Sequence, residues 1–327
     1  MQTNNPVKLI LFLAYICCFV LLITLVQHKP VDTYLETLKQ SEVRSQLSER
    51  DIEREIEELA RKMEEPAINA RIDRVWQAIP GYNGIQVDRE RSLRFSKEVG
   101  QVNWKTLILQ EIEPEISLSD LPPHPIYRGN PKKPMVAFMV NVAWGTEYLE
   151  EMLSIFDQYQ VKATFFLDGK WLKEQEKMAK KILVHGHEIG NHAYSHPDLR
   201  KLSVERIREE IVKTEELINR LGTKSRFFAP PAGAYDQRVV QIAHEHQMYT
   251  VLWTLDTVDW QKPDAEVIVE RIVPNLENGA LILMHPTAPT VEALPRLIEG
   301  ALEKELLPVT VSELISPSRN YFIERLE

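Results

Sequence analysis

Short apolar segments alternate with amphipathic stretches from residue 135 to residue 315 of this 327-residue chain. The apolar segments lie at 136–140, 163–167, 188–191, 226–228, 249–253, 280–284 and 308–311. The clearest amphipathic stretch lies between two of these segments and ends at Gly222. Its apolar stripe has helical spacing and consists of Val204, Ile207, Ile211, Ile218 and Leu221. Seven strand–helix repeats are typical of a parallel barrel built from β/α units, which we predict over 135–315.

Polar side chains follow several of the predicted strands. Asn141, Asp168, His192, Asp259 and His285 each come just after an apolar segment. In β/α barrels the chemistry lies at the C-terminal ends of the strands. We therefore expect these five side chains to converge on one cleft.

Two histidines in the segment 186–197 are candidate metal ligands. His192 and His196 are four residues apart, so their imidazoles can close on one divalent ion such as zinc. The same spacing also fits two solvated loop histidines, and the pair alone leaves both interpretations open.

The segment 186–197 resembles the second signature of the polysaccharide deacetylase (NodB-homology) family. Further segments match that family in the same order: 163–166 is similar to its second barrel strand, 253–260 to its D-x-x-D-W element, 280–285 to its last motif and 307–314 to its closing strand. The pattern is most similar to the sporulation-linked, YlxY-like branch. The resemblance implies a distorted (β/α)7-type barrel that hydrolyses the acetamido C–N bond of an N-acetylated envelope glycan, such as the peptidoglycan glycan strand.

The resemblance also implies roles for the surviving residues. His192 and His196 match the metal ligands, and His285 matches the acid that protonates the leaving amine. Asp259 matches the carboxylate that orients this histidine or keeps it protonated, with Asp256 as a weaker candidate. The alternative for Asp259 and His285 is a buried hydrogen-bonded pair without a remaining function.

Three residues are candidates for contact with the substrate. Trp260 and Leu283 match the apolar wall that receives the acetyl group, and Asn141 stands at the end of the first strand. We expect all three to line the cleft.

The chain departs from the family at two motifs. Where relatives carry D-V-D-W-G, Asn141 stands at the position of the general base and Ala143 at that of a metal ligand. Where relatives carry F-R-P-P-Y-G, Ala229 and Ala232 replace the arginine and the tyrosine. An amide takes up no proton near neutral pH, and a methyl group donates no lone pair. We therefore expect a divalent metal to be bound weakly or not at all.

Asp168 offers a substitute carboxylate at the end of the second strand. It is a candidate base or ligand, but an Asp at this place is also a good N-cap for a helix that starts near Trp171. Two functions remain open. One is a slow or altered metal-dependent deacetylase, and the other is an inactive barrel that binds glycan or scaffolds envelope assembly.

Residues 1–28 are predicted to form an N-terminal signal anchor. The run 9–27 is apolar, uncharged and just long enough to span a bilayer, and no good cleavage site follows it. This predicts a single-pass membrane protein whose C-terminal part is extracytoplasmic, as the family resemblance implies. The alternative is a secreted protein after signal cleavage. The adjacent Cys17 and Cys18 lie inside this run and form no disulfide framework.

The segment between anchor and barrel divides by composition. Residues 29–66 are charge-rich and predict a helical stalk, with Ser48 as a helix start. Residues 67–113 predict a small α+β module with Trp76 and Trp104 in its core.

The flanks of the barrel are a linker and a tail. Residues 114–134 are rich in proline and predict a linker, and residues 316–327 predict a C-terminal tail. The formal net charge of −9 argues against nucleic acid as a partner and is compatible with a neutral glycan.

Overall fold

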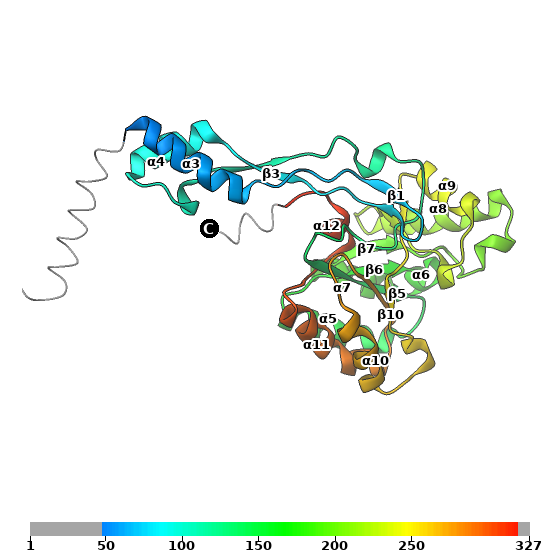
Figure 1. Cartoon of the computed structure of the whole chain (residues 1–327). Coiled ribbons are helices and arrows are strands. Elements are labelled where there is room, and N and C mark those ends of the chain that lie inside the picture. Colours follow the sequence, from blue (N-terminus) through cyan, green and yellow to red (C-terminus); the bar gives the residue numbers. More distant parts are fainter. Residues whose placement is uncertain (1–47, 320–327) are drawn as a thin grey trace, which may run out of the picture. The chain divides into compact units, whose positions relative to one another are not determined.

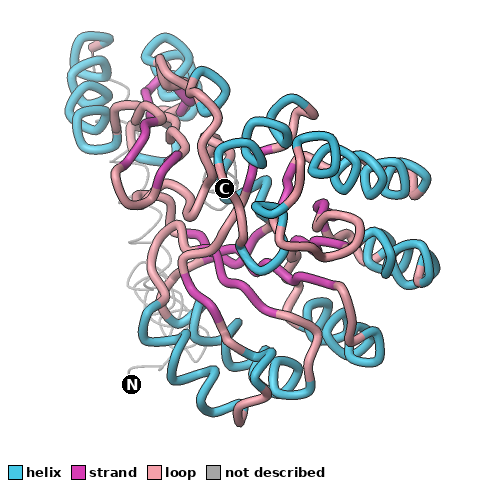
Figure 2. The backbone as a smooth tube through the Cα atoms, turned by 90° about the vertical axis from the view of Figure 1, so that its right-hand side faces the viewer, coloured by secondary structure: helices cyan, strands magenta, loops and turns pink. Residues whose placement is uncertain are grey.

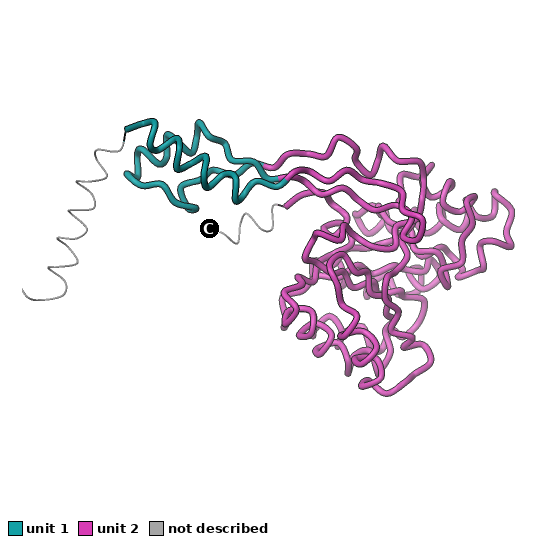
Figure 3. Tube along the Cα trace, viewed as in Figure 1, with its two compact units in different colours: residues 1–65, 85–110, 326–327 teal, residues 66–84, 111–325 magenta. Residues whose placement is uncertain are grey.

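A computed structural model describes residues 48–319, which fall into two compact units (Figures 1 and 3). The smaller unit comprises residues 48–65 and 85–110, and the larger one residues 66–84 and 111–319. The predicted anchor, the first part of the predicted stalk and residues 320–327 of the predicted tail lie outside the described residues. Among residues 48–319, no helix combines the length and apolar character needed to cross a bilayer.

The smaller unit is built on two helices, α3 (Glu49–Met63) and α4 (Arg89–Val99). Ser48 begins α3 as predicted, because its side chain accepts from the Asp51 amide while the Asp51 side chain accepts from the Ser48 amide. A short apolar cluster that includes Ile56 and Ala60 holds the unit together.

This division differs from the predicted 67–113 module. The apolar face of α3 is covered by residues from the predicted module, so α3 and α4 share one core. Trp104, expected in that core, is 48% exposed, and Trp76 is half-buried beneath the Arg128 guanidinium. Two small sheets complete the segment: β1 (Arg71–Asp73) with β2 (Gln77–Ile79), and β3 (Gly84–Val87) with β4 (Leu109–Ile112).

The larger unit holds a parallel sheet in the order β10-β11-β5-β6-β7-β8-β9, with β12 also paired to β5. The strands are β5 (Met135–Val142), β6 (Thr164–Leu167), β7 (Glu188–Asn191), β8 (Phe227–Phe228), β9 (Tyr249–Thr250), β10 (Leu255–Asp256), β11 (Leu281–Met284) and β12 (Leu307–Val309). Each predicted strand is present, and β10 is an additional short one. No strand pairing joins β9 to β10 among the described residues, so the sheet is a half-barrel.

Helices lie around the strands of this unit (Figure 2). They are α5 (Thr146–Gln158), α6 (Gly169–Glu174), α7 (Glu176–Val184), α8 (Val204–Arg220), α9 (Gln237–Glu245), α10 (Ala265–Ile272), α11 (Ala288–Glu303) and α12 (Val311–Ile315). All eight residues of β5 are buried because its two faces pack into different clusters. Phe138 and Val140 face the helices, whereas Ala137 and Met139 fill the interior with Phe166.

The proline-rich segment 114–134 is not a free linker. Ile126 is fully buried in the interior cluster, and its amide donates to the Thr250 carbonyl at 2.9 Å. The Leu252 amide in turn donates to the Ile126 carbonyl at 2.8 Å. Prolines have no amide donor and suit such an irregular path along a sheet edge. The segment therefore belongs to the larger unit.

Candidate active-site cleft

A cleft of about 370 Å³ opens at the C-terminal ends of the strands. Its lining residues are Asn141, Ala143, Trp144, His192, His196, Ala232, Trp253, Asp256, Trp260, Leu283 and His285. Most of the predicted site residues therefore meet in one place, which follows from the parallel order of β5, β7 and β11.

The two histidines after β7 lie side by side, with His192 buried and His196 exposed. The rings of His192 and His196 lie 5.1 Å apart between centroids at an angle of 68°. His192 Nδ1 donates to the Ala229 carbonyl at 2.7 Å, so its Nε2 is left as an acceptor. Burial lowers the pKa of His192 to about 3, and partial desolvation at the cleft also lowers the pKa of His196. Both imidazoles are therefore neutral near pH 7, the form that binds a metal.

Glu210 on α8 holds the loop that carries these histidines. Its buried carboxylate accepts from the Tyr194 amide at 3.0 Å, the Ser195 amide at 2.7 Å and the Ser195 hydroxyl at 2.8 Å. The loop needs such support because Ala193 and His196 have φ values of 61° and 54°, in the left-handed region. Our sequence reasoning missed Glu210. The signal was a charged residue between Ile207 and Thr214 on the buried face of the helix.

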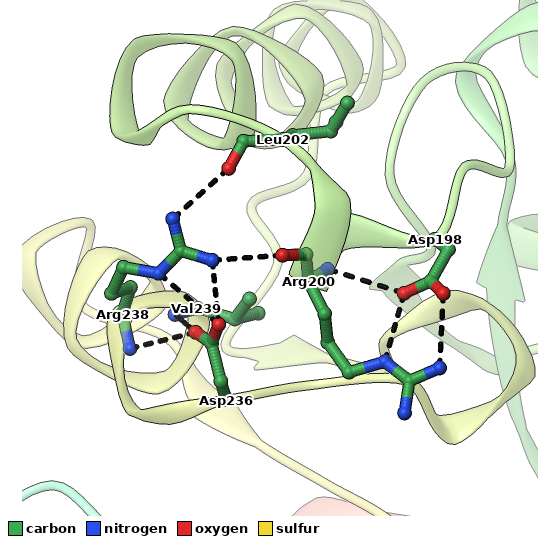
Figure 4. A network of polar contacts seen from close by, with 6 residues as sticks. All are labelled: Asp198, Arg200, Leu202, Asp236, Arg238 and Val239. Atoms are coloured by element: carbon green, nitrogen blue, oxygen red, sulfur yellow. Dashed lines mark hydrogen bonds and ion pairs between the residues drawn. The ribbon is translucent and has the colours of Figure 1, made fainter.

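A second polar network fixes the segment that follows the histidines (Figure 4). The Arg238 guanidinium donates to the Leu202 carbonyl at 3.0 Å and to the Arg200 carbonyl at 2.9 Å. It also pairs with Asp236, which caps α9. The network thus joins the segment after His196 to the start of α9.

His285, which lines the cleft and is partly buried, pairs with the fully buried Asp259. His285 Nδ1 donates to Asp259 Oδ1 at 2.8 Å, and the His285 amide donates to Oδ2 at 2.6 Å. The Thr290 hydroxyl donates to the same Oδ2 at 2.5 Å, so a fully buried carboxylate is well satisfied. His285 Nε2 is free of this pair, and the ring stacks on Trp144 with an interplanar angle of 7°.

A strained turn places Asp259 beneath His285. Val258 has a φ of 54°, which is rare for a β-branched residue, and its amide donates to Asp256 Oδ1 at 2.8 Å. Asp256 therefore supports the turn from the cleft wall, whereas Asp259 contacts the histidine.

Aromatic and aliphatic side chains line the rest of the cleft. Leu283 is 3% exposed, while Trp144 and Trp260 are 43% and 54% exposed. Trp253 completes the wall. Large exposed aromatic faces beside a polar cleft suit the apolar faces of sugar rings.

Comparison with known proteins agrees with this geometry. The family model described as polysaccharide deacetylase matches residues 128–251. An uncharacterized protein, YlxY, from Bacillus subtilis strain 168 is 44% identical over 313 residues, which cover 95% of this chain and 98% of that protein. A peptidoglycan-N-acetylglucosamine deacetylase from Bacillus cereus is 34% identical over 199 residues, covering 59% of this chain and 72% of that protein. The chain belongs to the polysaccharide deacetylase family.

Solved structures of similar proteins include two that are described as a CE4 family pseudoenzyme. A wild-type protein from Bacillus anthracis described as a CE4 family pseudoenzyme is 43% identical, with a TM-score of 0.76 over 82% of this chain and 95% of that one. A mutant of that protein, described as having restored enzymatic activity, is 42% identical with a TM-score of 0.76 over 82% of this chain and 98% of that one.

The donor set of the cleft does not fit a catalytic zinc ion. Catalytic zinc normally has three protein ligands, and here the family's carboxylate position is the methyl group of Ala143. Within residues 48–319, no three His, Cys, Asp or Glu side chains are grouped to hold a metal ion. Only His192 and His196 remain as a candidate pair.

Asp168 lies outside the cleft lining. Its Oδ1 accepts from the Trp171 amide at 2.9 Å and caps α6, while Oδ2 is buried without a hydrogen-bond partner. Burial raises the pKa of Asp168 to about 6. The helix-cap alternative accounts for the contact that Oδ1 makes.

Asn141 and Ala229 show how the departures from the family are accommodated. Asn141 is 3% exposed and lines the cleft, and its Oδ1 is buried without a partner. Ala229 is fully buried in the interior cluster beside Phe166 and Phe227. The arginine position is thus occupied by apolar packing rather than by a charge.

Proposed function

We propose that the chain binds N-acetylated cell-envelope glycan in this cleft and hydrolyses its acetamido groups slowly or not at all. The observation that carries the proposal is the lining itself. It keeps His285, His192 and the aromatic walls, but presents Asn141 and Ala143 where the family has aspartates. A pseudoenzyme from Bacillus anthracis among the similar structures supports the same interpretation.

The retained residues suit binding. Trp144 and Trp260 offer exposed faces to sugar rings, and Leu283 offers an apolar contact to the acetyl methyl group. Asp259 fixes the His285 ring, so His285 Nε2 is held ready to share a proton with a sugar oxygen or nitrogen.

The missing residues account for weak turnover. Loss of a general base typically costs about 10²–10⁴ in rate. Ala143 leaves two imidazoles where a zinc ion would supply an activated water and polarise the acetyl carbonyl. Because Asp168 caps α6 outside the lining, we do not assign it the role of either missing carboxylate.

The relatives support a substrate class for this chain. Similar proteins from Bacillus cereus and Listeria monocytogenes are described as peptidoglycan-N-acetylglucosamine deacetylases, which supports the peptidoglycan glycan strand as the ligand. The resemblance to the sporulation-linked branch supports a role in building the spore envelope.

We also propose that residues 9–27 anchor the chain at the outer face of the cytoplasmic membrane, where this glycan lies. The uncharged apolar run supports this placement. Recovery of the mature protein in the medium, with an N-terminus after residue 27, would show cleavage instead.

Two measurements on the full chain test the proposal. Binding to purified peptidoglycan should be retained in the wild type and lost in Trp260→Ala, whereas acetate release should stay at or little above the level of a blank. Absence of binding by well-folded wild type would refute the glycan-binding function.

A further inference from the structure

We propose that Asn141 makes this cleft a selective receptor for the intact acetamido group, so that the chain distinguishes N-acetylated glycan from deacetylated glycan. The inference rests on the proposed glycan-binding function. It goes beyond it by assigning a recognition role to a residue that stands where the family has its general base.

The first support is an unsatisfied polar atom. Asn141 is 3% exposed near the end of β5, and its Oδ1 has no hydrogen-bond partner among the described residues. Buried polar atoms in folded proteins are nearly always hydrogen-bonded, so an orphan acceptor at the wall of a cleft indicates a donor supplied by a ligand.

The second support is chemical complementarity. An acetamido group carries one N–H donor and one carbonyl acceptor, and the Asn141 side chain carries both kinds of group. Ala143 and Leu283 line the same cleft and supply apolar surface for the acetyl methyl group. A carboxylate at residue 141 would accept the N–H but could not donate to the carbonyl.

The third support is charge. Deacetylation converts the neutral acetamido group into an amine that is protonated at mildly acidic pH. Asn141 and Ala143 remove the two carboxylates that the family pattern would place beside this cation. The carboxylate of Asp259 is already satisfied by His285 and Thr290. Asp256 keeps a carboxylate in the cleft lining, but its Oδ1 already accepts from the Val258 amide. An ammonium group beside Leu283 would therefore lose hydration and gain at most a shared ionic partner, so the acetylated form is favoured.

The test is calorimetric titration of the full chain with two ligands of equal length, the N-acetylglucosamine pentamer and the glucosamine pentamer, at a pH where the amines are protonated. We expect the acetylated pentamer to bind at least about tenfold more tightly. In Asn141→Leu, which has a similar shape, binding of the acetylated pentamer should weaken about tenfold while binding of the glucosamine pentamer changes little. In Asn141→Asp the new carboxylate should strengthen binding of the glucosamine pentamer.

Asn219→Leu is the matched control, because Asn219 is exposed on α8 and is not a cleft residue. It should keep the wild-type preference. A wild type that binds both pentamers equally, or Asn141 variants that keep the wild-type preference, would overturn the inference while leaving glycan binding intact. A folded wild type that binds neither pentamer would instead refute the proposed function.

Discussion

Replacing Glu210 should loosen the histidine loop, and the size of the effect follows from its contacts. In Glu210→Ala the amides of Tyr194 and Ser195 and the Ser195 hydroxyl lose their acceptor. Hydrogen bonds to a charged group contribute about 1.5–3 kcal/mol each, and the effects are not additive when water replaces part of them. We expect a loss of about 3 kcal/mol in the free energy of unfolding of the larger unit. For a unit of this size that corresponds to a fall in Tm of about 6–12 °C.

Differential scanning calorimetry of the full chain measures this change, with Glu216→Ala as control. Glu216 is exposed on the same helix, so its removal should change the free energy of unfolding by less than about 0.5 kcal/mol. Glu210→Gln keeps one acceptor oxygen and should fall between the two. If Glu210→Ala lowers Tm no more than Glu216→Ala, the carboxylate does not hold the loop.

Three further predictions concern how buried polar side chains affect the stability of the fold. Burial lowers the pKa of His187 to about 4, so the folded state favours its neutral form and stability is lost as pH falls from 6.5 through 4. In urea titrations between about pH 7 and pH 4.5, the wild type should lose about 2 kcal/mol more unfolding free energy than His187→Asn. Equal losses in the two proteins would contradict this prediction. Because the pKa of Asp168 is raised to about 6, stability is lost as pH rises through 6. Asp168→Asn, which can keep the helix cap, should therefore have a higher Tm than the wild type at about pH 8 but not at about pH 4. If its Tm at about pH 8 is no higher, burial does not raise the pKa of this carboxyl group. Asn141→Leu removes an unsatisfied buried oxygen and should raise the unfolding free energy by about 1 kcal/mol, whereas a clear loss would mean that Oδ1 is satisfied in the free protein.

Strands β5, β6 and β11 could be predicted because they are largely apolar runs that the fold buries on both faces. The run Met135–Val142 is the clearest example, since every residue of β5 is buried. Strand β10 could not be predicted, because Leu255 and Asp256 form no apolar run. Proline content suggested a linker at 114–134, but burial of Ile126 depends on a partner strand far along the chain. The shared core of α3 and α4 likewise depends on contacts that separate sequence windows do not show.

The cleft was accessible to sequence reasoning where residues follow strands. His192 and His285 directly follow β7 and β11, so a parallel sheet brings them to one edge. Glu210 acts from a helix and carries no strand-end signal. For Asp168 the sequence allowed both a cap and a substitute ligand, and the two differ only in where the carboxylate points, which local pattern does not encode.

Acetate release from N-acetylglucosamine oligomers, measured together with the zinc content of the full chain after dialysis against a mild chelator, tests the central claim most directly. The account predicts little or no acetate above a blank and no stoichiometric zinc for the wild type. The double variant Asn141→Asp with Ala143→Asp should first gain zinc, because a carboxylate completes a His-His-Asp set, and turnover should then rise further when Ala229→Arg is added. Robust wild-type release of acetate that is lost in Asp168→Asn would contradict the account and make Asp168 the substitute carboxylate.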